Sequence, residues 1–180
     1  MLRNVLCLVM LVSFCMLNGC ASNSGSAEMA YSGVEANKKP RDPALSHAIT
    51  VSDVTGGQET NPLLSSQISN ENFKEALKLS LEKANLHSNS LGGKYKLNAK
   101  LIKLDQPFLG LDLTVTAQVH YILKNSKTNQ VIYNKNIDSS YTAKVSDSYV
   151  AITRLKMANE GAARANIQNL IEDLYGLQVR

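Results

Sequence analysis

Apolar and polar residues alternate along the middle of the chain in three long runs. Residues 94–101 place every second side chain on an apolar side, and residues 112–124 do the same except at Ile122. After a polar stretch at 125–130, residues 131–145 keep their apolar side chains in phase. A period of two is typical of strands buried on one face, and a short polar stretch between two such runs favours a hairpin. These segments therefore predict an antiparallel three-strand meander.

Two further segments carry apolar side chains at the spacing of one helix face. Ser69 or Asn70 can cap the first helix, and residues 146–148 offer caps for the second, which Gly176 would end. The apolar positions are Phe73, Ala76, Leu77, Leu81 and Ala84 in the first segment and Ile152, Leu155, Ala162, Ile167, Leu170, Ile171 and Leu174 in the second. The spacing predicts two amphipathic helices, the second of them long.

The final helix has two features that the pattern alone does not explain. Small residues at 158, 161, 162 and 165 favour tight packing inside the protein over an interaction notch. Glu160 precedes Arg164 by four residues, which is the order expected for an ion pair on a helix surface.

A first strand is predicted at 48–54, where β-branched residues run up to the turn Gly56-Gly57. The order β-α-β-β-β-α then predicts an α+β fold: an antiparallel sheet of about four strands with two helices on one face. The place of the first strand stays open. It can lie at an edge or beside the last strand, and a parallel pairing would use the helix at 73–86 as its crossover.

The start of the chain follows a different pattern. Residues 1–19 carry a positive charge, Arg3, near their start, and an apolar run follows it. This run is shorter than the ~20 residues that a membrane-spanning helix needs. We therefore interpret residues 1–19 as a cleaved export signal. Leu17-Asn18-Gly19-Cys20 resembles the lipobox of bacterial lipoproteins. The resemblance implies cleavage between Gly19 and Cys20, diacylglycerol on the Cys20 sulfur, an acyl chain such as palmitate on its amino group and, because Ala21 follows, transport to the outer membrane.

Residues 20–46 are rich in Ser, Gly, Ala, Asn and Pro, a composition that cannot bury enough apolar surface to fold alone. We expect a flexible tether there, with an r.m.s. reach of ~25–30 Å; a segment that becomes ordered on a partner is the alternative. Residues 47–180 are expected to form a single periplasmic domain. Cys20 would be the only cysteine of the mature chain, so no disulfide framework is predicted.

Charge and chemistry add mainly exclusions. The formal net charge is +4, from 19 Lys and Arg against 15 Asp and Glu spread along the chain, which does not favour nucleic-acid binding. The three histidines, His47, His87 and His120, lack neighbours at metal-ligand spacing, so neither a metal site nor a cofactor other than the lipid is expected. No serine or cysteine motif of nucleophilic catalysis is present. We therefore expect a protein that is not an enzyme.

With the lipobox, the helix start at 69–73 and the terminal segment at 158–167, the chain resembles small outer-membrane lipoproteins of Gram-negative bacteria, most nearly the YajG-like group. The resemblance implies a domain on the periplasmic side with a non-enzymatic binding or accessory role in envelope assembly or maintenance, an envelope protein or glycan being the partner. The alternative is a periplasmic enzyme acting on envelope polymers or lipids. The polar side of the predicted sheet is the expected binding face, with Lys96, Lys100, Thr114, Thr116, Gln118 and His120. Lysines at 94, 96, 100 and 103 favour a solvated strand face over a contact with anionic lipid or glycan.

Overall fold

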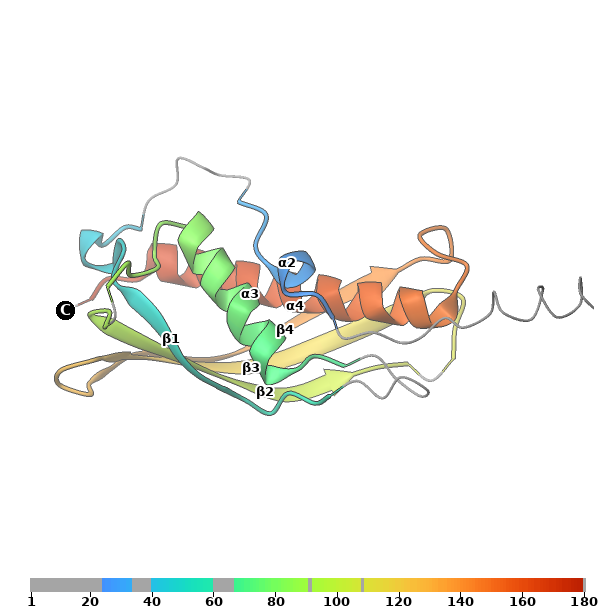
Figure 1. The fold of residues 1–180 in the computed structure, drawn as a ribbon, viewed down its shortest axis with the longest axis horizontal. Helices are drawn as coiled ribbons and strands as arrows, with labels where there is room; N and C mark the ends of the chain where they lie inside the picture. Colours follow the sequence, from blue (N-terminus) through green and yellow to red (C-terminus); the bar gives the residue numbers. More distant parts are fainter. Residues whose placement is uncertain (1–23, 34–39, 60–66, 91, 108, 180) are drawn as a thin grey trace, which may run out of the picture.

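A four-stranded sheet with its helices on one side is the framework of the protein (Figure 1). The computed structural model describes residues 24–33, 40–59, 67–90, 92–107 and 109–179. The strands are β1 (Ile49–Thr55), β2 (Tyr95–Asp105), β3 (Leu113–Asn125) and β4 (Val131–Ala143). The helices are α2 (Ser26–Met29), α3 (Asn70–Lys83) and α4 (Ala151–Gly176), with a short 3-10 helix, η2, at Pro43–Leu45. The predicted α+β class and the order of its six main elements are confirmed.

The strands are arranged in the order β1-β2-β3-β4, so the predicted meander is confirmed as the pairs β2–β3 and β3–β4. The sheet is not wholly antiparallel, because β1 runs parallel to β2 at one edge, with Ile49 opposite Tyr95. Parallel neighbours need a crossover connection, and α3 supplies it. The structure thus answers the question that the sequence left open about the first strand.

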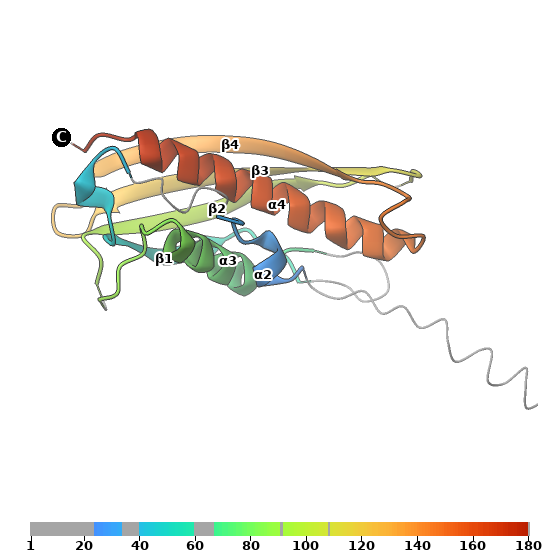
Figure 2. The ribbon, with the colours of Figure 1, turned by 90° about the horizontal axis from the view of Figure 1, so that it is seen from above.

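The core lies between the sheet and the helices, with α3 against β1 and α4 against β3 and β4 (Figures 1 and 2). Alternation along β2 and β3 turns one set of side chains into this core, as predicted. Phe73 and its helical neighbours are buried on the inner side of α3. The Ser69 hydroxyl accepts a hydrogen bond from the Asn72 backbone N–H at 3.2 Å, which confirms the predicted cap.

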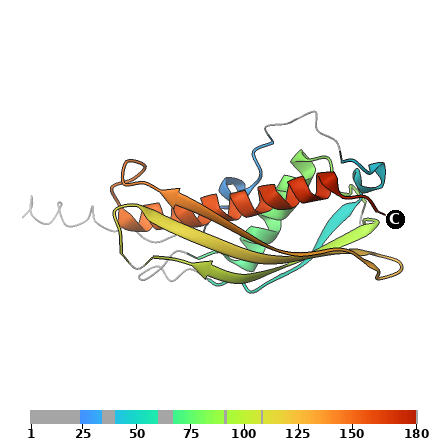
Figure 3. The same cartoon turned by 180° about the vertical axis from the view of Figure 1, so that it is seen from behind.

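Helix α4 starts later than its predicted caps. Its N-cap is Val150, which offers no side-chain acceptor, while the Asp147 carboxylate accepts a hydrogen bond from Lys144 N–H at 2.8 Å and thus closes the preceding turn. Within α4, a Cβ added at Gly161 would overlap the Tyr141 ring of β4. This contact confirms tight internal packing at the small residues (Figure 3 views β4 and α4 from behind).

The segment predicted as a flexible tether is the main correction. Met29 and Leu45 are fully buried, and Tyr31 N–H donates to the Ser80 hydroxyl at 2.9 Å. The prediction of flexibility is therefore wrong for residues 24–33 and 40–46, the part of the segment that the structure describes. The overall composition of the segment is polar, but its few apolar side chains pack into the core of the domain.

Glu160 and Arg164 hold this segment and do not form the predicted surface ion pair. Glu160 is only 6% exposed, and its carboxylate accepts a hydrogen bond from Gly25 N–H at 2.8 Å. Arg164 donates to the Glu28 carbonyl oxygen at 2.6 Å. Burial raises the pKa of the Glu160 carboxyl above its ordinary value, although the Gly25 hydrogen bond and Lys156 lower it. The two side chains therefore attach α2 to α4.

Candidate binding surface

The outer face of the sheet, the side without helices, carries all six residues that the sequence assigns to binding. Lys96 and Lys100 lie on β2, and the other four, Thr114, Thr116, Gln118 and His120, lie on β3. Pairing of β2 with β3 places Lys100 opposite His120. The alternation thus predicted a shared face correctly, while the binding role of these residues stays a prediction.

Strand β4 extends this polar face with residues that the prediction left out. Its outward positions are Asn134, Asn136, Asp138, Ser140 and Thr142, all exposed. Three of them bond to the predicted residues: Thr114 to Thr142 at 2.8 Å, Thr116 to Ser140 at 2.7 Å and His120 to Asn134 at 2.7 Å. Every second residue from Asn134 to Thr142 is polar, so the alternation in the sequence was enough to identify these positions. The outer face is therefore a ladder of hydroxyl and amide groups across two strands.

Lysines give the β2 side of the outer face a positive character. Lys103 pairs with Asp105 at 3.0 Å, but both partners are largely exposed, so the pair adds little stability. Lys96 and Lys100 form no ion pair with any described residue. A hollow of about 160 Å³ lies beside Lys100. Its other lining residues are Asp53, Thr55, Asn98, Ala99, His120 and Ile122. Hydroxyls, amides and lysines in this arrangement can contact a polar or anionic partner.

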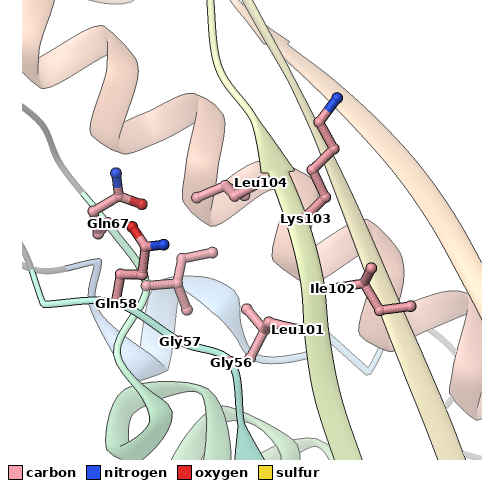
Figure 4. Close-up of a pocket in the computed structure, with 9 residues that line it drawn as sticks. Gly56, Gly57, Gln58, Gln67, Leu101, Ile102, Lys103 and Leu104 are labelled. Atoms are coloured by element: carbon pink, nitrogen blue, oxygen red, sulfur yellow. The ribbon is translucent and has the colours of Figure 1, made fainter.

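A second cavity, of about 220 Å³, lies where β1 ends beside the last residues of β2 (Figure 4). Gly56 has a φ of 81° at this point, and a Cβ there would overlap the Leu101 carbonyl oxygen. Figure 4 shows the amides of Gln58 and Gln67 at the cavity and the Lys103 side chain directed away from it. The described residues that line the cavity therefore offer it mainly amide and backbone groups.

The remaining predictions fall partly outside the described residues. Gly19 and Cys20, with the rest of the signal and lipobox, lie there. Within the described ranges, no group of three or more His, Cys, Asp or Glu side chains could hold a metal ion. In those same ranges, no helix is both long and apolar enough to cross a membrane.

No family model matches the sequence, and none of the curated proteins matches it. Several solved structures are similar to the chain. A DUF330 protein from Xanthomonas campestris is 13% identical and has a TM-score of 0.53 over 76% of this chain and 89% of that one. A PelC dodecamer from Paraburkholderia phytofirmans is 12% identical, with a TM-score of 0.51 over 78% and 95%. A candidate lipoprotein from Caulobacter crescentus is 18% identical, with a TM-score of 0.49 over 73% and 90%.

The chain is thus similar to bacterial proteins of known structure, and the likeness to the Xanthomonas and Paraburkholderia proteins shows a shared fold.

Proposed function

We propose that this protein is a lipid-anchored lipoprotein of the outer membrane whose periplasmic domain binds an envelope protein or glycan without catalysing a reaction. The lipobox resemblance at Cys20 supports the anchor, and Ala21 supports the outer membrane as the destination. Within such lipoproteins, the YajG-like group is the proposed relative, on the resemblance of the lipobox, the helix start at 69–73 and the terminal segment at 158–167.

One observation carries the binding role. The outer face presents polar side chains from neighbouring strands, while the helices cover the opposite face and bury the core. A polar sheet face that no described element covers can contact a partner without exposing the core. A periplasmic enzyme acting on envelope polymers or lipids stays the alternative, and the pocket beside α3 with Glu71, Lys74, Glu75, Lys78 and His87 is where its ionisable groups would lie.

Crosslinking with mass spectrometry on intact envelopes tests this proposal, because it identifies the partner and the contact residues together. The double variant Lys96→Glu/Lys100→Glu reverses two charges on the outer face. Its matched control, Lys74→Glu/Lys83→Glu, reverses two exposed lysines on α3 that likewise form no ion pair with any described residue.

We expect the outer-face variant to lose crosslinks to the partner and the control to keep them, with both melting temperatures nearly unchanged since exposed substitutions cost only ~0.5 kcal/mol. Equal loss in both variants, or full capture by the outer-face variant, would contradict the proposed surface. The partner identified can also be a second copy of the chain, because PelC, which shares the fold, is a dodecamer. Turnover of envelope polymers by the purified protein would favour the enzyme.

A further inference from the structure

Large apolar side chains are exposed at one end of the domain. Leu109 and Leu111 precede β3 and are 91% and 77% exposed, and Tyr149 and Val150 precede α4 and are 90% and 52% exposed. The β2–β3 and β4–α4 connections lie at the same end of the sheet, opposite the C-terminus (Figure 1). We call these four residues the apolar end. Exposed leucines and an exposed tyrosine gathered in this way are typical of an interaction site.

Hydrogen bonds hold the two connections in place. The Asp112 carboxylate accepts a hydrogen bond from Val145 N–H at 2.9 Å and joins one connection to the other. Arg154, which is buried, donates to the Ser148 carbonyl oxygen at 2.6 Å, next to Tyr149. These two hydrogen bonds link the connections to each other and to α4. The exposed apolar side chains therefore extend from a pair of loops that is held in place.

Two hydrogen bonds to α4 show that the N-terminal segment, followed toward its start, runs toward the apolar end. Gly25 bonds to Glu160, whereas Glu28 bonds to Arg164, one turn farther from the start of α4. Followed backward from Glu28 to Gly25, the chain therefore runs toward the first turns of α4. Glu160 lies ten residues from Val150, which is ~15 Å along a helix.

The length of chain before this attachment is short. Ser24 is fully buried, and its N–H donates to the Gln67 carbonyl oxygen at 3.3 Å, so the chain is attached to the domain at this residue. Counted from Gly25, which is bonded to Glu160, Cys20 is five residues away, and five extended residues span at most ~17 Å. An anchor on Cys20 can therefore reach the level of the apolar end, but it cannot let the domain move ~25–30 Å away as a free tether of residues 20–46 would.

We infer that the apolar end contacts the lipid bilayer, with Leu109, Leu111, Tyr149 and Val150 at the membrane surface beside the anchored Cys20. This inference rests on the proposed lipid anchor. Leucine side chains enter the boundary between headgroups and acyl chains, and a tyrosine places its ring there with its hydroxyl toward water. The domain then has a fixed orientation, with the long axis of the sheet leading away from the membrane.

Tryptophan fluorescence of the mature lipidated protein in phosphatidylethanolamine and phosphatidylglycerol vesicles tests this contact. The chain has no tryptophan, so Leu111→Trp and Tyr149→Trp each report one position. Val131→Trp is the matched control, because Val131 is 47% exposed and lies at the other end of the β3–β4 pair. About twelve residues of strand separate the two ends, which is ~40 Å.

We expect blue-shifted emission for Leu111→Trp and Tyr149→Trp, and loss of intensity when the lipids are brominated on their acyl chains. Val131→Trp should lose intensity to aqueous iodide instead. Equal iodide quenching of all three probes would overturn the inference, as would a blue shift that brominated lipid does not quench, which indicates a protein contact. Flotation of the parent protein and of Cys20→Ser reports the anchor separately: a parent chain that does not float overturns the proposed anchor, and the bilayer contact with it.

Discussion

The two faces of the sheet are built from the same strands, yet their polar groups have different surroundings. On the helix-covered face, Asn166 of α4 is fully buried and donates to the carbonyl oxygens of Ala117 and Ile137 at 3.0 and 2.7 Å. On the outer face, Thr116 and Ser140 make a hydrogen bond of 2.7 Å in contact with water. The bond lengths are similar. The two faces differ in burial: a buried group that loses its hydrogen-bond partner stays unsatisfied, whereas an exposed one can bond to water.

The largest effect is expected for Asn166→Ala. This change removes the partner of two carbonyl oxygens and of the buried Tyr121 hydroxyl, which donates to Asn166 at 2.9 Å. Because the orphaned groups are out of reach of water, the free energy of unfolding should fall by about 3 kcal/mol. Urea denaturation measures it. Tyr121→Phe is the control and should cost only about 1 kcal/mol, since it removes one bond; similar losses in both variants would show that the asparagine has no special role.

A smaller effect, visible in its pH dependence, is expected for Glu160→Gln. Burial raises the pKa of Glu160 above its ordinary value of 4.5, so the folded protein binds this proton more tightly than the unfolded chain. Its contribution to stability is then complete below about pH 4.5 and is lost as the pH rises through the folded-state pKa. Glutamine stays neutral and its carbonyl oxygen can still accept from Gly25 N–H. The melting temperature, measured at several pH values across this window, should depend less on pH in the variant than in the parent protein. An unchanged dependence would assign the pH effect to another group.

The smallest effect is expected on the outer face. Thr116→Val removes the hydrogen bond to Ser140 and keeps the shape of the side chain. Water can replace the lost partner, so the free energy of unfolding should change by no more than about 0.5 kcal/mol. The same urea experiment measures it. A loss as large as that of Asn166→Ala would remove the distinction between the two faces.

Sequence patterns predicted the elements whose buried side is apolar. Alternation identified β2 and β3, and the spacing around Phe73 with the Ser69 cap identified α3. The outer face followed from the same alternation, although the polar positions of β4 were overlooked.

The polar residues inside α4 could not be predicted in this way. Asn159, Glu160 and Asn166 read as solvent-facing by residue type, and each is buried because a partner distant in sequence satisfies it. The packed segment at 24–33 was missed for the same reason, since its partners lie on helices 49 to 136 residues later. Long-range partners leave no periodic signal in the chain.

The hydrogen bond between Gly25 and Glu160 also constrains the order of events while the protein is made. Its two residues are 135 positions apart, and Glu160 belongs to the last helix. A chain is synthesised and exported from its N-terminus, so the contact cannot form until nearly all of the chain has emerged. The attachment of Gly25 to α4 is therefore completed only after the final helix has folded, later than contacts such as Ser24 with Gln67, whose residues emerge much earlier.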